Sequence, residues 1–391
     1  MISRTIRAAV VLLCATAAAV LPGTPALADQ VRDNQWHLRY LNIAAAHKIS
    51  QGKGVTVAVI DTGVDPHPDL RNNLLPGTVT YPGGTGDGRQ DGDPGGHGTG
   101  MAGLIAAHGR GNSGALGIAP KAKILPVQDG KGRRSGESTD TATAIRWAIS
   151  KNVSVINISE AVAPTQELRK AIEEAFNADI VVVAAVGNRP EESLVQYPAA
   201  IDGVVAVGSV DRRGNHSDTS VTGKQVVITA PGVDIVSTAK GNKYSKTYGT
   251  SNATAIVSGA VALIRSRYPD LSAKEVVHRL TSTAVDKGAP GRDEEYGYGV
   301  LDIVAALTAD VPPLAGDATP STSTNPNPTP TTADNNDTNT DPEPDNTSTI
   351  LTTIALAGCT ALFVLALLTT LLTLTLIRRK KTTPRPPPYH S

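Results

Sequence analysis

Three residues of complementary chemistry stand far apart in this sequence: Asp61, His97 and Ser251. Each lies in a glycine-containing turn beside an apolar segment, in the stretches VAVIDTGVD, GGHGTGMAGLIAA and GTSNATAIVSGA. A serine hydroxyl is a poor nucleophile near neutral pH and needs a base to remove its proton. A histidine can act as that base, while a carboxylate fixes the tautomer of the ring and stabilises the imidazolium. The three residues therefore predict nucleophilic catalysis by Ser251.

Acyl transfer also develops negative charge on an oxygen, and the sequence offers two donors for it. Ser251 opens an apolar segment with helical character, so the N–H groups of a helix N-terminus would lie beside its hydroxyl. Asn188 follows an apolar run in VVVAAVGN and can donate from its side-chain amide. We expect Asn188 and the Ser251 backbone amide to form an oxyanion hole.

Taken singly, each of these residues has a more ordinary use. Asp61 could cap a turn at a strand end, and His97 could be a loop histidine with satisfied ring nitrogens. Ser251 could be a helix N-cap, and Asn188 could occupy a turn. Their joint occurrence favours the catalytic interpretation.

A metal site is the rival chemistry, because Asp61, Asp65, His67 and Asp69 lie close together in the sequence. Two prolines alternate with them and break any regular element, and no distant segment resembles a second set of ligands. The sequence therefore favours no catalytic metal, and we expect no cofactor.

The segments around these residues alternate between apolar, β-branched runs and amphipathic helices. Continuous apolar runs are typical of strands that are covered on both faces. The pattern predicts an α/β fold in which a mostly parallel sheet is sandwiched between two helical layers, and ligands of such sheets bind beyond the carboxyl ends of the strands. The predicted strands are 55–60, 124–127, 153–158, 180–185, 204–210 and 226–230, and the predicted helices are 139–151, 165–178 and one that opens with the capping box of Ser272 and Glu275.

The four stretches around Asp61, His97, Asn188 and Ser251 resemble the signature blocks of the subtilase family of serine proteases. They follow that family's order, Asp then His then Ser, which differs from the order in chymotrypsins and α/β-hydrolases. The resemblance covers roughly residues 35–307 and implies a subtilisin-like fold, peptide-bond hydrolysis by a triad and an oxyanion role for Asn188. Many subtilases hold a structural calcium ion, but no ligand set for one can be read from this sequence.

The segment after VINIS departs from the family pattern. Subtilases usually place small or apolar residues there, at an edge that binds the substrate, whereas this chain continues with Glu160 and Ala161. A carboxylate at this edge could favour basic or polar substrate side chains, or it could point to solvent. The residues that the resemblance assigns to substrate binding are Ser159, Glu160, Ala161 and Gly187.

The two ends of the chain predict export and membrane anchoring. Residues 1–28 combine a basic start, an apolar run and a final Ala-Leu-Ala, as in a cleaved signal peptide, although an uncleaved anchor is the alternative. Residues 29–50 form a short extension that we expect to wrap the peptidase domain, predicted over 51–310. The only cysteines, Cys14 and Cys359, lie outside that domain, so we expect it to contain no disulfide.

Residues 311–349 are rich in Pro, Thr, Asn and Asp and predict a disordered spacer. Residues 350–377 are apolar and long enough to cross a bilayer, and the basic tail 378–391 follows at once. The positive-inside rule then places the tail in the cytoplasm and the peptidase domain outside, on a single-pass protein of the cell membrane. A cell-wall sorting signal would need a Leu-Pro-x-Thr-Gly motif, which does not precede the apolar run.

This layout is similar to that of the mycosins, subtilases that accompany type VII secretion systems in actinobacteria. The resemblance implies a protein or peptide substrate and contact with the secretion complex in the membrane. A general surface protease and a non-catalytic partner of the secretion apparatus are the alternatives. Basic and acidic residues balance at 36 each, so no global charge favours a nucleic-acid partner.

Overall fold

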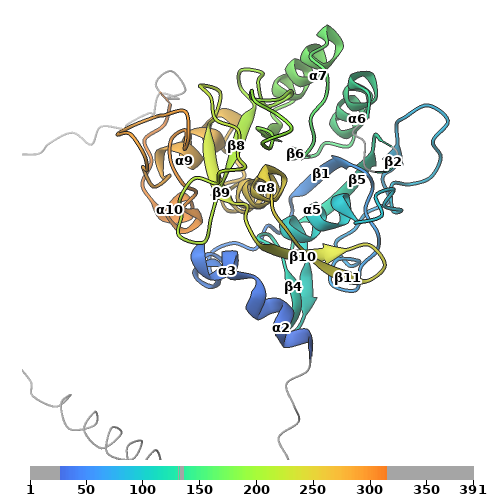
Figure 1. Ribbon diagram of the computed structural model, residues 1–391, viewed down its shortest axis with the longest axis horizontal. Coiled ribbons are helices and arrows are strands. Elements are labelled where there is room, and N and C mark those ends of the chain that lie inside the picture. Colours follow the sequence, from blue (N-terminus) through green and yellow to red (C-terminus); the bar gives the residue numbers. More distant parts are fainter. Residues whose placement is uncertain (1–26, 131, 133–135, 315–391) are drawn as a thin grey trace, which may run out of the picture. The chain divides into compact units, whose positions relative to one another are not determined.

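A seven-stranded parallel sheet forms the centre of the fold (Figure 1). The structure is a computed structural model that describes residues 27–130, 132 and 136–314. The strands lie in the order β2-β5-β1-β6-β7-β8-β9, so β1 has β5 on one side and β6 on the other. Their bounds are β1 Thr56–Asp61, β2 Thr78–Val79, β5 Lys123–Gln128, β6 Val155–Ile158, β7 Val181–Ala185, β8 Val205–Val210 and β9 Ile228–Pro231.

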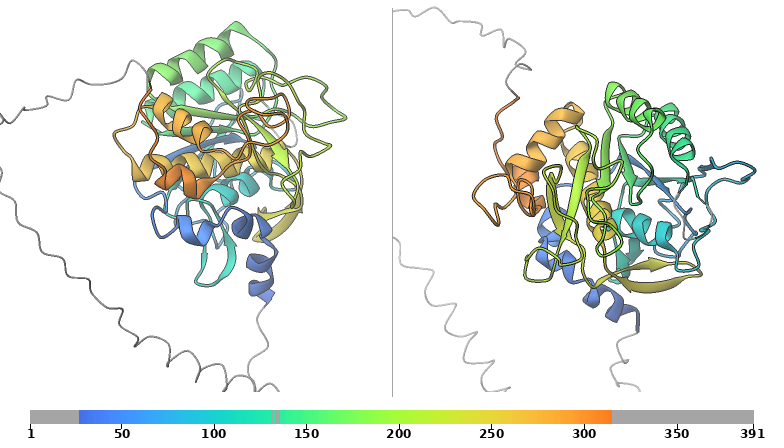
Figure 2. Two further views of the ribbon diagram at one scale, coloured as in Figure 1. Left: turned by 90° about the vertical axis from the view of Figure 1, so that its left-hand side faces the viewer. Right: turned by 45° about the horizontal axis from the view of Figure 1, so that its top comes forward.

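Alternate residues of β1 enter two separate cores, because successive side chains of a strand point to opposite faces. Val57 and Val59 pack with α5 (His97–Ala106) and α8 (Thr250–Arg267), whereas Ala58 and Ile60 pack with α6 (Ser138–Ser150) and α7 (Gln166–Asn177). Figure 2 shows the resulting layers, with the green helices on one side of the strands. Both faces are covered, which explains the continuous apolar runs.

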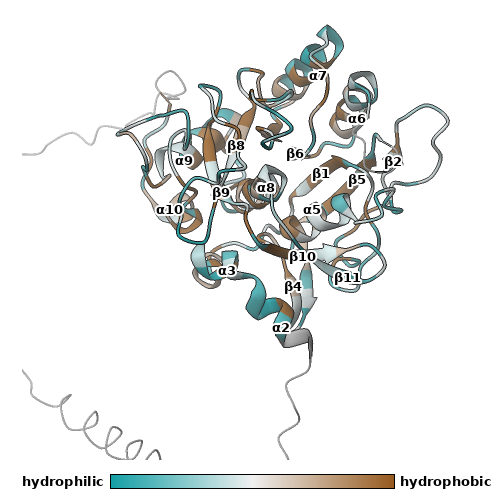
Figure 3. Cartoon of the chain, in the orientation of Figure 1, coloured by the Kyte–Doolittle hydropathy of each residue, from teal (hydrophilic) through white to brown (hydrophobic). Residues whose placement is uncertain are grey.

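The central helix α8 packs on the same face of the sheet as α5 and contacts β6, β7, β8 and β9. Nearly all of its side chains are buried, whereas α7 buries only the stripe of Leu168, Ala171, Ile172 and Ala175. The hydropathy colouring in Figure 3 shows the same contrast, with brown in the strands and a teal outer side on α7. Two further helices, α9 Ala273–Ser282 and α10 Ile303–Thr308, pack against α8.

The N-terminal segment lies along the domain, as we expected. Its helices are α2 Leu27–Asn34, α3 Trp36–Tyr40 and α4 Ile43–Ala46. Arg32 donates to the carbonyl of Gly114, Gln35 exchanges hydrogen bonds with the backbone of Leu116, and Trp36 Nε1 donates to the carbonyl of Val233. These bonds hold the segment against loops that are far away in the sequence.

The fold class and the six predicted strands are confirmed, with shifts of one or two residues at their ends. The predicted helices over 139–151 and 165–178 are α6 and α7, and the capping box of Ser272 and Glu275 opens α9. The sequence pattern did not predict β2 or two hairpins, formed by β3 (His108–Arg110) with β4 (Ser113–Leu116) and by β10 (Ile235–Ala239) with β11 (Lys243–Thr247).

The predicted membrane helix over 350–377 lies outside the described residues, as do the predicted spacer from residue 315 onward and most of the predicted signal peptide. Within residues 27–130, 132 and 136–314, no helix has the length and apolar character that a bilayer crossing needs.

Candidate active site

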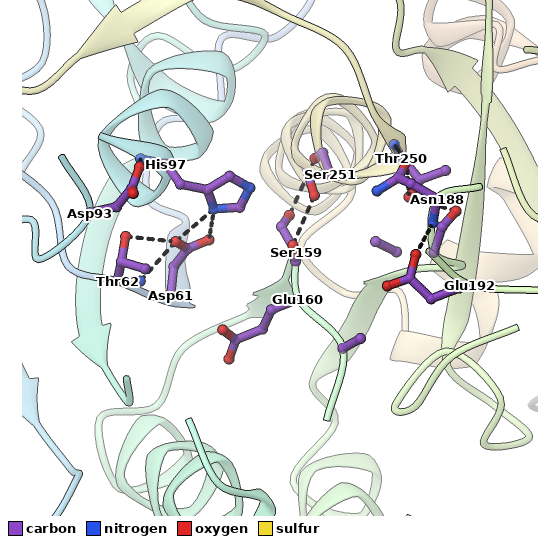
Figure 4. Close-up of a pocket in the computed structure, with 13 residues that line it drawn as sticks. Asp61, Thr62, Asp93, His97, Ser159, Glu160, Asn188, Glu192, Thr250 and Ser251 are labelled. Carbon is purple, nitrogen blue, oxygen red and sulfur yellow. Dashed lines mark hydrogen bonds and ion pairs between the residues drawn. The ribbon is translucent and has the colours of Figure 1, made fainter. Parts of the chain in front are cut away.

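A cleft of about 380 Å³ opens beyond the carboxyl ends of β1, β6 and β7. Figure 4 shows the side chains that line it. All eight residues that the sequence assigned to the site lie in this lining: Asp61, His97, Ser159, Glu160, Ala161, Gly187, Asn188 and Ser251. The lining also includes Thr62, Asp93, Ala185, Glu192 and Thr250, which the sequence did not assign.

Asp61 and His97 form a close pair at one end of the cleft. Asp61 is the last residue of β1 and His97 the first of α5, and His97 Nδ1 lies 2.8 Å and 3.0 Å from the two carboxylate oxygens. Asp61 is buried, and its Oδ1 also accepts the N–H of Thr62 at 2.7 Å. A carboxylate held in this way fixes the Nδ1–H tautomer and leaves Nε2 as the basic atom.

The close approach of β1 and α5 requires glycine at position 98. A Cβ atom there would lie 2.1 Å from the carbonyl oxygen of Gly63 and 3.1 Å from Asp61 Oδ1. The HGTG sequence therefore has a packing reason: any side chain at Gly98 would push His97 away from Asp61.

A second buried carboxylate, Asp91, ties these two elements together. Its Oδ1 accepts the Thr62 hydroxyl at 2.8 Å, and its Oδ2 accepts the Thr99 hydroxyl at 2.6 Å and the Thr99 N–H at 2.8 Å. Burial raises the pKa of Asp91, and the hydrogen bonds from Thr99 and Thr62 oppose that rise. Asp91 therefore positions the ends of β1 and α5. Sequence reasoning missed it, because a single aspartate in a glycine-rich loop carries no periodic signal.

Carboxylates also set the charge state of His97. Burial of the ring lowers the pKa of His97, but the charge and hydrogen bond of Asp61 raise it, with further contributions from the charges of Asp91 and Asp93, so that the pKa reaches about 9. The opposite charges thus outweigh desolvation. With this pKa both ring nitrogens of His97 carry a proton near neutral pH.

Ser251 lies in the first turn of α8, across the cleft from His97 (Figure 4). Its Oγ donates to the carbonyl of Ser159 at 2.9 Å, and Ser159 Oγ donates back to the carbonyl of Ser251 at 3.2 Å. Among the described residues, no hydrogen bond joins His97 Nε2 to Ser251 Oγ. Of the two contacts expected in the triad, the one between Asp61 and His97 is therefore formed, and the one between His97 and Ser251 is not. Rotation about the Cα–Cβ bond of Ser251 changes the direction of its hydroxyl between staggered positions.

Asn188 lies beside the start of α8, with its amide orientation fixed by the helix. Its Oδ1 accepts the N–H of Thr250 at 2.9 Å, so the Nδ2 group faces away from that bond. No acceptor for Nδ2 lies among the described residues. Ser251 is the second residue of α8, so its own N–H has no intrahelical acceptor. The site thus presents two N–H donors beside the Ser251 hydroxyl.

The acidic cluster that suggested a metal site is dispersed over different partners. Asp61 holds His97, Asp65 accepts the N–H groups of Asp91 and Gly241, and Asp69 binds Arg110 at 2.8 Å. The described part of the chain contains no group of three His, Cys, Asp or Glu side chains arranged to hold a metal ion.

Three comparisons with known proteins, by family profile, by sequence and by structure, indicate the same family. The profile of the Subtilase family (Peptidase_S8) matches residues 52–299. A thermostable alkaline protease of Halalkalibacterium halodurans is 37% identical over 272 residues, which are 68% of this chain and 71% of that protein.

Two solved structures are also similar. MycP1 with its N-terminal propeptide removed has a TM-score of 0.65 and 32% identity, covering 71% of this chain and 98% of that one. The MycP3 protease from the type VII (ESX-3) secretion system has a TM-score of 0.61 and 33% identity, covering 74% and 91%. The chain belongs to the subtilase family and is a serine-type endopeptidase, with a structure similar to those of the mycosins.

Proposed function

We propose that this protein is a mycosin: a protease anchored in the cell membrane, with its peptidase domain outside, that serves a type VII secretion system. The observation that supports its chemistry most directly is the cleft in which the Asp61–His97 pair, the Ser251 hydroxyl and the Asn188 amide share one lining. Similarity to MycP1 and MycP3 supports the secretion role. The apolar run 350–377 with its basic tail supports the anchor.

In the mechanism that we propose, Ser251 Oγ attacks the carbonyl carbon of the scissile peptide bond while His97 Nε2 takes the hydroxyl proton. Asn188 Nδ2 and the Ser251 N–H stabilise the oxyanion that forms. His97 then gives the proton to the departing amine, which leaves an acyl-enzyme on Ser251. Water, activated by His97, hydrolyses the ester and restores the serine. No step requires a cofactor.

Peptide hydrolysis by the purified protein tests the chemistry. Ser251→Ala should abolish turnover and leave the unfolding temperature unchanged, because Ser251 is partly exposed in the cleft. Ser150→Ala, on the exposed end of α6, is the matched control and should keep full activity. Cleavage that survives Ser251→Ala and is lost on adding a chelator would instead support the metal alternative.

Membrane anchoring is tested by comparing the full chain with a version that ends at residue 349. The full chain should sediment with membranes and release a soluble domain when intact cells are treated with an external protease. The shortened chain should pass into the medium. Sedimentation of both versions would refute the proposed anchor, and protection from external protease would refute the proposed orientation.

The secretion role is separated from general surface proteolysis by complementing a deletion strain. Wild type should restore export of the type VII substrates. Restoration by Ser251→Ala as well would favour a structural role in the secretion apparatus, and normal export in the deletion strain would leave a general surface protease.

A further inference from the structure

A turn that follows β7 binds both polar groups of the Asn188 backbone. Asn188 comes three residues after the end of β7, and Glu192 lies four residues further along the chain. The Asn188 N–H donates to Glu192 Oε2 at 2.7 Å, and the Glu192 N–H donates to the Asn188 carbonyl at 2.9 Å. A carboxylate accepts such a bond more strongly than a neutral oxygen does, so the first contact is the stronger of the two.

The Asn188 backbone has no other way to bind its N–H group. Its two chain neighbours pair with another segment, since the Arg189 N–H donates to the Thr219 carbonyl at 2.8 Å and the Gly187 carbonyl accepts the Val221 N–H at 3.2 Å. In antiparallel pairing the next residue along points its backbone groups the opposite way. The Asn188 N–H therefore faces away from residues 219–221 and toward Glu192, which is its acceptor among the described residues.

The Asn188 side chain is held separately, by the start of α8. Its Oδ1 accepts the N–H of Thr250 at 2.9 Å and the hydroxyl of Thr250 at 3.3 Å. Figure 4 shows Thr250 and Glu192 on either side of Asn188, at the end of the cleft away from His97. The direction of Nδ2 therefore depends on two contacts, one with the backbone and one with Oδ1.

The charge of Glu192 gives this position a cost. Glu192 lines the same cleft as Ser251, where the reaction develops a negative charge on an oxygen. A carboxylate nearby disfavours that charge, and the described lining contains no lysine or arginine that would offset it. What the Glu192 carboxyl group contributes is therefore its bond to Asn188, and not its charge.

From these contacts we infer that Glu192 is a positioning residue of the oxyanion hole, which fixes the Asn188 backbone so that Nδ2 points at the oxyanion. The inference rests on the oxyanion role of Asn188 in the proposed mechanism. Loss of the bond should lower kcat by about tenfold or more, and by less than the 10²–10³ that loss of the amide itself costs. KM should change little, because the oxyanion exists only in the transition state.

Three substitutions separate the bond from the charge. Glu192→Ala removes the acceptor, and Glu192→Asp keeps the charge but withdraws the carboxylate from the Asn188 N–H, so both should lose about tenfold or more in kcat. Glu192→Gln keeps the length and an acceptor oxygen, so its kcat should stay within about twofold of wild type. Glu191→Ala, an exposed neighbour in the same turn, is the matched control and should keep the wild-type kcat.

A wild-type kcat in Glu192→Ala would overturn the inference. It would also be overturned if activity followed the charge, with Glu192→Asp active and Glu192→Gln impaired. Thermal unfolding identifies a variant that fails to fold, and if Glu192→Ala is one, the comparison of Glu192→Asp with Glu192→Gln decides.

A double-mutant cycle then tests whether Glu192 acts through Asn188. In the Asn188→Ala background no amide remains to be positioned, so adding Glu192→Ala should lower kcat by less than about twofold further. An equal loss in both backgrounds would show that Glu192 acts independently of Asn188, and the inference would fail.

Hydrogen exchange of the Asn188 N–H separates this inference from the proposed function. If the wild-type protein cleaves no peptide, the proposed function has failed, but the contact can still be measured on the purified full chain. Exchange at Asn188 should be slow in wild type, Glu191→Ala and Glu192→Gln, and faster in Glu192→Ala. Equal exchange in wild type and Glu192→Ala would refute the positioning role.

Discussion

The pH dependence of hydrolysis should report the carboxylates around His97. With the pKa of His97 at about 9, roughly one ring in a hundred is neutral at pH 7 and about half are neutral at pH 9. Since only the neutral ring can take the Ser251 proton, kcat/KM should rise about fiftyfold between these pH values. The sign follows from the direction of the shift: a raised pKa moves the active form to higher pH.

Replacing Asp61 by asparagine should change both the height and the position of this profile. The Thr62 N–H holds Oδ1 at 2.7 Å, so the amide nitrogen of an asparagine would take the place of Oδ2, which lies 3.0 Å from His97 Nδ1. That nitrogen donates toward Nδ1 and competes with the bond to Oδ1, which lies 2.8 Å away, so the hold on the Nδ1–H tautomer weakens and kcat should fall by up to about 10⁴. The loss of the negative charge also removes the largest cause that raises the His97 pKa. The rise of kcat/KM with pH should therefore occur at lower pH than in wild type.

The assay is kcat/KM for a chromogenic peptide, measured from pH 5 to pH 10 on wild type and Asp61→Asn. Asp87→Asn, which changes an exposed carboxylate paired with Arg89, is the control and should keep the wild-type profile. If kcat/KM rose at the same pH in Asp61→Asn as in wild type, the rise would not report the titration of His97. If the wild-type kcat/KM rose around the ordinary pKa of histidine, this would refute the reasoning that the three carboxylates raise the His97 pKa more than burial lowers it.

The remaining predictions concern the residues around this pair. Asn188→Ala should lower kcat by about 10²–10³ with little change in KM, which is the loss that removing the oxyanion asparagine causes in a subtilisin, and an unchanged kcat would remove Asn188 from the oxyanion hole. Asp91→Ala should lower both kcat and the unfolding temperature, because it removes the acceptor of the Thr99 hydroxyl and one of the two acceptors of the Thr62 hydroxyl; a fall in temperature alone would show that it does not position His97. Ser272→Ala should reduce the free energy of unfolding by about 1 kcal/mol in denaturant titration and leave kcat unaltered, since it removes the N-cap of α9 far from the cleft; an unchanged stability would contradict the capping box.

Much of the fold could be predicted because buried parallel strands have a strong signal. Val181–Ala185 is a continuous apolar run, Val205–Val210 is interrupted only by Gly208 and Ser209, and every residue of both strands is buried, as in strands with both faces covered. The strand β11 has the sequence KYSKT and is largely exposed, so its polar composition concealed it. Its pairing with β10 depends on the hairpin and not on burial.

The candidate site could be predicted where a functional residue ends a strand or begins a helix. Glu192 lies in the turn beyond Asn188, where no such rule applies, and its contact with the Asn188 N–H exists only in the folded chain. The direction of the Ser251 hydroxyl was beyond prediction, because its acceptor is a backbone carbonyl 92 residues away in the chain. The role of Asp91 depends in the same way on contacts that only the folded chain brings together.

Covalent labelling tests the central claim most directly. A fluorophosphonate probe reacts with a serine hydroxyl only where a base and an oxyanion hole activate it, so it reports on the whole site at once. Peptide mass mapping of the labelled wild-type protein should place the adduct on Ser251, with no adduct in Ser251→Ala and strongly reduced labelling in His97→Ala. An adduct on another residue, or labelling of Ser251→Ala equal to that of wild type, would contradict the account.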